Sequence, residues 1–105
     1  MTDKRIVLTT TGSDEEARKI ARGLVEQKLA ACVNIIPRVE SIYRWQGKIE
    51  STQEWLLIIK TTAERFPGVR DAIRALHSYD LPECIAFSVE EGSSPYLKWL
   101  EDSVT

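Results

Sequence analysis

The chain has 105 residues, of which 43% are hydrophobic and 29% are charged, and its formal net charge is -2. These values are typical of one globular domain with one hydrophobic core, and we expect that domain to span residues 1–105. The small net charge excludes a dedicated nucleic-acid binder, which would carry a strong basic excess. No stretch approaches the roughly 18 apolar residues of a membrane span, and the first residues do not form a signal-peptide pattern. We therefore expect a cytoplasmic protein that binds neither nucleic acid nor membrane.

The first predicted elements are a strand and an amphipathic helix. Residues 5–11 have the composition of a strand, which ends at Gly12. Ser13 followed by Glu16 is typical of a helix start with a reciprocal capping box. Apolar residues then recur at helical spacing on one face of the helix. They are Ala17, Ile20, Ala21, Leu24, Val25 and Leu29.

The next stretch, from Cys32 to Thr61, predicts two long strands joined by a tight turn at Gln46-Gly47. Every second residue of a strand points to the same face, and in each strand this set is rich in β-branched and aromatic residues. On the first strand these are Val33, Ile35, Val39, Ser41, Tyr43 and Trp45, and on the second Ile49, Ser51, Gln53, Trp55, Leu57 and Ile59. Gly47 can supply the positive φ of a short hairpin loop. The alternative is a strand broken at Pro37 with a looser loop beyond it.

The predicted hairpin is too long for its own domain to cover. Each arm would span on the order of 40 Å at about 3.3 Å per residue, whereas a domain of this size has a radius of gyration of about 13 Å. A free two-stranded ribbon is marginal in water and its open edge invites pairing. We therefore expect a homo-oligomer in which Tyr43, Trp45 and Trp55 anchor the interface. A ligand platform is the other interpretation of these aromatic residues.

The remaining elements complete a known architecture. A second helix is expected after Thr61-Thr62, with Pro67 as its first regular residue. A loop over residues 77–83, a strand over 84–90 and a short helix from Ser94 follow. The order β-α-β-β-α-β predicts an α+β, ferredoxin-like fold. Right-handed crossovers then give an antiparallel sheet in strand order 4-1-3-2, with both long helices on one face.

The polar residues of the 77–83 loop are the first candidates for chemistry. His77 is the single histidine, and it either serves as a metal ligand or general base or caps the preceding helix as a cation. Tyr79, Asp80 and Glu83 follow it closely. Lys60, at the end of an apolar strand, is either a surface residue or a partner for an anion.

The two cysteines, Cys32 and Cys84, are expected on opposite edges of the sheet. Three strand spacings would separate them by roughly 14 Å, which is too far for a disulfide or for binding one metal ion together. One histidine and two separated cysteines cannot form a closed tetrahedral zinc site in one chain. The sequence also lacks the usual catalytic motifs, so we do not expect an enzyme.

Five stretches resemble the motifs of one known family. Residues 29–35, Leu-Ala-Ala-Cys-Val-Asn-Ile, resemble the LAACVN signature of the CutA divalent-cation tolerance proteins. Residues 41–49 match the family pattern S-x-Y-x-W-x-G-K-[IL]. Residues 54–61 match the family segment E-x-x-[LM]-x-[LI]-K-T. Residues 77–83 resemble H-P-Y-E-x-P-E, and residues 96–100 resemble the terminal Y-x-x-W. The resemblance covers essentially the whole chain.

The resemblance implies a function as well as a fold. CutA proteins are tight homotrimers of ferredoxin-like subunits whose hairpins reach across to neighbours, and no enzymatic activity is established for them. They are associated with tolerance to copper and other divalent cations, so the implied partner and optional cofactor is a divalent cation, first of all Cu²⁺, which suits Cys and His ligands. The alternative is a trimer like the PII signalling proteins, which binds a small anionic ligand or a partner protein between subunits.

The candidate site residues follow from the loop and the resemblance together. The expected metal ligands are His77 and Glu83, with Cys32 as the next candidate. Lys60, Tyr79 and Asp80 are expected to line the cleft between subunits. The chain departs from the family pattern at Ser78, Asp80 and Cys84, where the family has proline, glutamate and an aliphatic residue.

Overall fold

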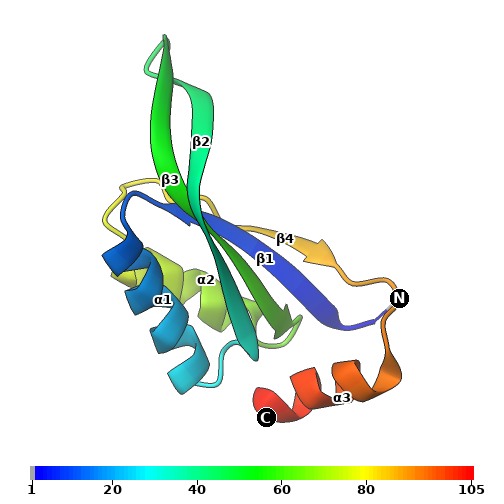
Figure 1. The fold of residues 1–105 in the computed structure, drawn as a ribbon. Helices are drawn as coiled ribbons and strands as arrows, with labels where there is room; N and C mark the ends of the chain where they lie inside the picture. Colours follow the sequence, from blue (N-terminus) through cyan, green and yellow to red (C-terminus); the bar gives the residue numbers. More distant parts are fainter. Residues whose placement is uncertain (1) are drawn as a thin grey trace.

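The computed structural model describes residues 2–105 as helices packed against a four-stranded antiparallel sheet; Met1 lies outside the described residues. The elements are β1 (Lys4–Thr11), α1 (Asp14–Glu26), β2 (Cys32–Trp45), β3 (Lys48–Thr62), α2 (Phe66–Leu76), β4 (Ile85–Ser88) and α3 (Ser94–Ser103). The strand order β2-β3-β1-β4 is the predicted one, and α1 and α2 lie on the same face of the sheet (Figure 1). The ferredoxin-like α+β fold is therefore confirmed.

The hydrophobic core lies between this face of the sheet and the two long helices. Its fully buried members come from both layers: Val7, Leu57 and Ile59 from the sheet, and Ile20, Leu24, Val69 and Ile73 from the helices. Val25, which helical spacing groups with the apolar face of α1, is 43% exposed. It lies at the margin of that face, beside the charged Arg22 and Glu26.

The start of α1 contains only half of the predicted capping box. The Ser13 hydroxyl oxygen accepts a hydrogen bond from the Glu16 backbone N–H at 3.2 Å, as expected. The Glu16 carboxylate does not return the bond to Ser13. It accepts bonds from the backbone N–H and the hydroxyl of Ser78, at 2.5 and 3.0 Å. The prediction of a reciprocal bond is wrong because the folded chain brings two donors of Ser78 to this carboxylate at once.

The hairpin of β2 and β3 closes at the predicted turn. Gln46 and Gly47 both have positive φ, 50° and 80°, as a two-residue turn of type I′ requires. The ribbon projects well beyond the body (Figure 1) and gives the subunit a long dimension of 44 Å against 25 and 22 Å. The far half of the hairpin therefore has no cover within the described chain.

A β-bulge interrupts the pairing of β2 with β3. Ile36 pairs with Leu56, but the next pair joins Val39 to Glu54, so β2 carries one extra residue. Arg38 inside the bulge has φ of 59°, a value that non-glycine residues adopt infrequently. An extra residue in one strand exchanges the two faces of that strand beyond the bulge.

The bulge corrects the predicted faces of β2. Val33 and Ile35 lie opposite Ile59 and Leu57 on the helix side. The residues beyond the bulge that were grouped with them, Val39, Ser41, Tyr43 and Trp45, lie on the other side of the ribbon. Period-two alternation missed the change because it assumes an uninterrupted strand. β2 runs without a break from Cys32 to Trp45, so the alternative of a strand broken at Pro37 is wrong.

The second half of the chain follows the prediction with small differences. α2 contains Pro67 in its first turn, although its N-cap residue is Arg65 and makes no side-chain cap bond. β4 covers four residues, whereas residues 84–90 were expected. α3 begins at Ser94 as predicted. It is tied to β1 by Lys4, whose Nζ lies 2.7 Å from Glu101 Oε1.

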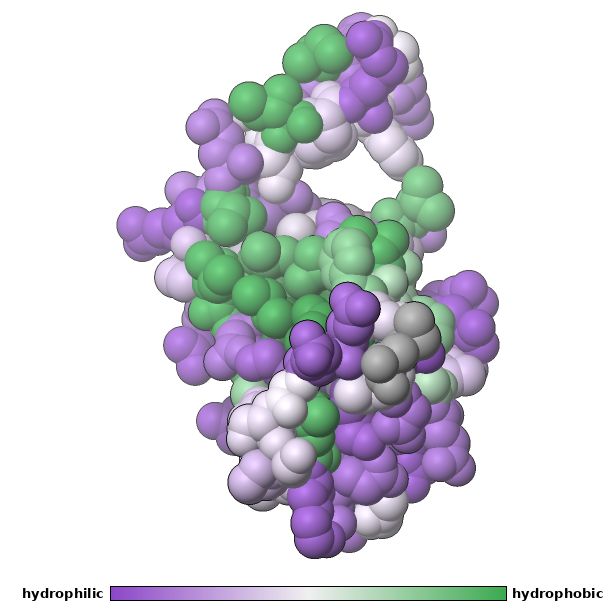
Figure 2. Space-filling model, turned by 90° about the vertical axis from the view of Figure 1, so that its right-hand side faces the viewer, coloured by the Kyte–Doolittle hydropathy of each residue, from purple (hydrophilic) through white to green (hydrophobic). Residues whose placement is uncertain are grey.

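The sheet face away from α1 and α2 carries exposed apolar side chains. Ile36, Ile85 and Phe87 are among the exposed large hydrophobic residues of the subunit. Figure 2 shows apolar residues gathered across this side of the molecule. We call these three residues and their partly buried neighbours Ile6, Leu8, Leu56 and Ile58 the open face. Exposed apolar patches mark sites of association.

The packing of α1 yields a test with two adjacent residues. We expect Leu24→Ala to lower the free energy of unfolding by about 2–5 kcal/mol, because it leaves a cavity in the core. Val25→Ala removes a half-exposed side chain and should cost less than about 1 kcal/mol. Urea unfolding monitored by circular dichroism compares the two. Equal losses would show that α1 packs differently.

Candidate functional site

A cavity of about 630 Å³ lies between the hairpin and the loop that follows α2. Its lining residues come from β1, β2, β3 and that loop: Thr10, Ser41, Ile42, Tyr43, Trp45, Glu54, Tyr79, Asp80, Leu81 and Glu83. Figure 2 shows an opening between the far half of the hairpin and the body. Small-molecule sites have volumes of about 300–1,000 Å³, so the size suits a small ligand.

Glu54 is the most deeply placed carboxylate of this cavity. Only 7% of the residue is exposed, and its Oε2 accepts a hydrogen bond from the Tyr79 hydroxyl at 2.8 Å. Burial and this carboxylate raise the pKa of Tyr79 far above its ordinary value, so the phenol stays a donor. Within residues 2–105, no basic side chain forms an ion pair with Glu54.

Glu83 responds to the same surroundings. Partial burial and, second, the negative charge of Glu54 raise the pKa of the Glu83 carboxyl. Asp80 adds a third carboxylate, and the lining contains no Lys, Arg or His side chain. The cavity is therefore a site of unneutralised negative charge, which favours cations over anions.

The loop is fixed by contacts behind the cavity. The His77 side chain is fully buried; its Nδ1 accepts the Tyr79 backbone N–H at 3.1 Å, and Nε2 lies 2.7 Å from the Thr10 carbonyl oxygen. Because Nδ1 is an acceptor, Nε2 must carry the proton donated to Thr10. His77 is also the C-cap residue of α2. It caps the helix through its backbone N–H, which donates to the Ile73 carbonyl oxygen. Its ring does not act as the expected cation, because one nitrogen donates to Thr10 and the other accepts from Tyr79.

Gly12 leaves room for the loop on its other side. A Cβ at Gly12 would lie 3.0 Å from the Tyr79 hydroxyl oxygen, closer than most real contacts. The glycine at the end of β1 therefore lets Tyr79 reach across to Glu54.

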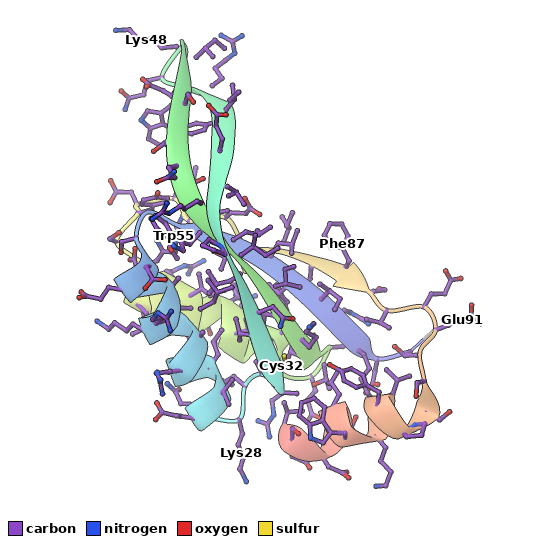
Figure 3. The ribbon with its side chains drawn as sticks, viewed as in Figure 1. Lys28, Cys32, Lys48, Trp55, Phe87 and Glu91 are labelled. Carbon is purple, nitrogen blue, oxygen red and sulfur yellow. The ribbon has the colours of Figure 1, made fainter. Side chains whose placement is uncertain are left out.

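Lys60 lies apart from the cavity. Its Nζ donates to Asn34 Oδ1 and lies 3.8 Å from Cys32 Sγ, on the neighbouring strand. Six residues of β3 separate Lys60 from Glu54, a distance of about 20 Å along a strand. Figure 3 shows Cys32 at the lower end of β2, whereas Trp55 lies at the other end of the body, where the free ribbon begins. One subunit therefore does not bring Lys60 to the cleft in which it was expected.

The other predicted site residues are divided in the same way. Tyr79, Asp80 and Glu83 line the cavity together, whereas Cys32 lies with Lys60. Both cysteines are free. Cys32 begins β2 at one edge of the sheet, and Cys84 directly precedes β4 at the other edge. Burial raises the pKa of the Cys84 thiol, which disfavours its thiolate as a metal ligand. In the described chain, no group of three or more His, Cys, Asp or Glu residues could hold a metal ion.

Sequence reasoning did not select Glu54 as a site residue. Alternation assigned it to the face opposite Trp55, which is correct, but Tyr43 and Trp45 were expected with Trp55. The bulge places both β2 aromatics on the face of Glu54. The available signal was a glutamate among the apolar residues at the inner end of the hairpin.

Comparison with known proteins agrees with this fold. A family model described as "CutA1 divalent ion tolerance protein" matches residues 5–103. The chain belongs to the CutA1 family. A CutA relative from Thermus thermophilus, named "Divalent-cation tolerance protein CutA", is 49% identical over 100 residues, which are 95% of this chain and 97% of the relative. The human "Protein CutA" is 47% identical over 91 residues. These are 87% of this chain and 51% of the human protein.

Solved CutA structures superpose closely on the subunit. The Thermus thermophilus structure has a TM-score of 0.95 at 48% identity, covering 97% of this chain and 99% of the other. The structure from Xylella fastidiosa has a TM-score of 0.97 at 42% identity, covering 99% and 100%. The CutA1 names refer to divalent-cation tolerance and indicate no catalytic activity.

The locations printed for other CutA proteins differ. An Arabidopsis relative is called chloroplastic, and the Archaeoglobus fulgidus structure is titled periplasmic. In this chain, none of the described helices has the length and apolar character needed to cross a membrane.

The raised pKa of Glu83 predicts how the cleft affects stability. Above the ordinary value of 4.5, folding must accommodate an ionised carboxylate that the folded state disfavours. Glu83→Gln should therefore raise the melting temperature near pH 7. The gain should disappear at acid pH, where Glu83 is protonated in both states. Thermal unfolding across pH tests this, with the exposed Glu64→Gln as control; a variant less stable than wild type at pH 7 would contradict it.

Proposed function

We propose that this chain takes part in divalent-cation tolerance as a homotrimer that binds a cation in a cleft of each subunit. The observation that carries the proposal is the cavity beside the hairpin, whose lining holds Glu54, Asp80 and Glu83 without a basic side chain. Such a concentration of negative charge attracts cations. The names of CutA relatives support the same class of ligand, since they refer to divalent-cation tolerance.

Two surfaces support the trimer. The open face exposes apolar side chains such as Ile85 and Phe87, and the hairpin extends beyond the body with Tyr43 and Trp45 about half exposed. A neighbouring subunit would remove both from water and would give the ribbon the partner that it lacks. The homotrimer implied by the CutA resemblance provides such a neighbour, with Trp55 at the base of the hairpin as a third anchor.

Hard divalent cations suit the cleft itself. Glu54, Asp80 and Glu83 offer oxygen ligands, which ions such as Mn²⁺ prefer. In the described chain the three carboxylates do not form a group that could hold one metal ion together, so at most two of them would coordinate the ion, water would supply the other ligands and the affinity would be modest. Tyr79 orients Glu54 through its hydrogen bond, as an outer-shell donor orients a metal ligand.

Copper, the cation expected from the sequence, prefers nitrogen and sulfur ligands. We propose Cys32 as its thiol ligand, with Asn34 Oδ1 4.0 Å from the sulfur. His77 with Glu83 is the alternative copper site. It requires the His77 ring to release either Thr10 or Tyr79, since both nitrogens are engaged.

The PII-like alternative needs a basic group that recognises an anion. Lys60 was the candidate, and in one subunit it lies with Asn34 and Cys32, away from the cavity. An anionic ligand would therefore depend on a neighbouring subunit that brings its Lys60 to the cleft. The cytoplasmic location and the absence of enzymatic activity stay predictions.

The oligomeric state gives the first test. Light scattering at micromolar concentration should give a mass about three times the 11.9 kDa of one chain. Trp45→Ala should destabilise the assembly by about 2–4 kcal/mol, in line with interface hot spots. The exposed Trp99→Ala on α3 is the matched control. A monomeric wild type, or unchanged mass and melting temperature in Trp45→Ala, would contradict the trimer and this anchor.

Calorimetric titration with Mn²⁺ and Cu²⁺ separates the two cation sites. Glu83→Gln should weaken Mn²⁺ binding on the order of tenfold, and Cys32→Ser should weaken Cu²⁺ without affecting Mn²⁺. Mn²⁺ affinity should fall on acidification, because protons compete for the carboxylates. This loss should begin above pH 4.5, the ordinary value for Glu83, because its pKa is raised.

The controls for this titration are His77→Ala and Glu64→Gln. Cu²⁺ binding that is lost in His77→Ala and kept in Cys32→Ser would move the copper site to the loop. An Mn²⁺ affinity that is the same in Glu83→Gln, Glu54→Gln and wild type would show that the cleft is not a cation site.

A further inference from the structure

The paired ends of β2 and β3 place two reactive side chains against each other, away from the cavity. Lys60 Nζ lies 3.8 Å from Cys32 Sγ. We propose that this pair is a site of oxidative modification, at which hydrogen peroxide leads to a covalent sulfenamide bond between the sulfur and the amine nitrogen. The reaction requires no bound cation, so it is independent of the function proposed above.

The strand register holds the two side chains together. Cys32 and Lys60 are 28 positions apart in the sequence, but they are direct partners in the antiparallel pairing of β2 with β3. Directly opposite residues share a face of the sheet, with Cβ atoms about 4.5–5.5 Å apart. The Ala31 backbone N–H donates to the Lys60 carbonyl oxygen at 2.9 Å and fixes this end of the pairing. The two groups therefore meet without any rearrangement of the backbone.

Asn34 keeps the amine close to the sulfur. Its Oδ1 accepts a hydrogen bond from Lys60 Nζ and lies 4.0 Å from Cys32 Sγ. Asn34 follows Cys32 by two positions, so both residues lie on the same face of β2. One amide oxygen thus contacts both reactants, and the end of a flexible lysine side chain is held beside the thiol.

Both reactants are accessible to a small oxidant. Cys32 and Lys60 are partly exposed, and β2 is an edge strand of the sheet. They lie in line with Ile6, at the polar margin of the open face. A lysine ammonium is strongly hydrated, so this margin keeps its water when a neighbouring subunit covers the apolar part. Accessible cysteines beside basic side chains are the ones that peroxide oxidises.

The modification proceeds in two steps. The Cys32 sulfur first attacks hydrogen peroxide: an S–O bond forms, the O–O bond breaks, water leaves, and the sulfur is oxidised by two electrons to a sulfenic acid. Lys60, after its ammonium has given a proton to water, then attacks that sulfur through its nitrogen. The S–N bond forms, the S–O bond breaks, and the hydroxyl group leaves with an amine proton as a second water.

The crosslink gives Cys32 an oxidised state that can be reversed. A sulfenic acid that finds no partner is oxidised further to a sulfinic acid, which thiols do not reduce. In the sulfenamide, two thiols of a reductant break the S–N bond, return the Cys32 thiol and the Lys60 amine, and become a disulfide. The lysine therefore protects the cysteine from irreversible oxidation.

Oxidation of the wild-type protein tests the crosslink. The assembled protein, in a buffer with a metal chelator, is treated with a few equivalents of hydrogen peroxide and then denatured for mass spectrometry. We expect a chain about 2 Da lighter, since two hydrogens are lost, and no tryptic cleavage after Lys60. Dithiothreitol should restore the mass and the cleavage. An unreacted chain, a chain that only gains oxygen, or two chains joined together would overturn the proposal.

Variants distinguish the sulfenamide from a disulfide, which also makes the chain about 2 Da lighter. The lighter product should persist in Cys84→Ser and disappear in Cys32→Ser. In Lys60→Arg the positive charge remains but the guanidinium does not lose a proton, so Cys32 should gain oxygen without a crosslink. Lys48→Arg at the hairpin turn is the matched control and should react as wild type.

The outcome is decided by two of these variants. Loss of the lighter product in Cys84→Ser, or its retention in Lys60→Arg, would overturn the proposal. Light scattering and circular dichroism show that each variant is assembled and folded, and the result with the wild-type protein stands without them.

Discussion

The bulge in β2 is the constraint on which the site depends. One extra residue between Ile36 and Val39 exchanges the faces of the outer half of the strand. Without it, Tyr43 and Trp45 would lie on the side of the helices, opposite to Glu54. With it, the aromatic side chains of β2 and the carboxylate of β3 line one cavity. The left-handed backbone of Arg38 is the local cost of this arrangement.

The loop after α2 forms the second wall through contacts from distant parts of the chain. Glu16 in α1, Thr10 in β1 and Glu54 in β3 each bind one of its residues. These contacts occupy polar groups for which the sequence predicted other partners. The Glu16 carboxylate binds Ser78 and not the backbone of Ser13. Both nitrogens of the His77 ring are engaged in hydrogen bonds, so neither is free to bind a metal ion. The loop is therefore held as part of the core scaffold, and its carboxylates face the cavity.

Two features of the isolated subunit lack a partner: the apolar open face and the buried Glu54 carboxylate. The open face leaves apolar side chains such as Phe87 exposed to water. Within residues 2–105, no basic side chain forms an ion pair with the Glu54 carboxylate of the cavity. Association with further copies would relieve the first cost and a cation the second. Because the hairpin takes part in both, assembly and ligand binding would be coupled through its position. The CutA1 proteins share this subunit fold from bacteria to plants.

Periodicity and turn chemistry act locally, so the order of elements, the ferredoxin-like fold, the strand order and the turn at Gly47 could be predicted from the amino-acid sequence. It also identified Tyr79, Asp80 and Glu83 as neighbours, since they are close along the chain. Tertiary structure decided the rest. The faces of β2 depend on a bulge that alternation cannot register, and the burial of His77 depends on the Thr10 carbonyl across the fold. The separation of Lys60 from the cleft likewise depends on its place along a long strand, which only the assembled sheet defines.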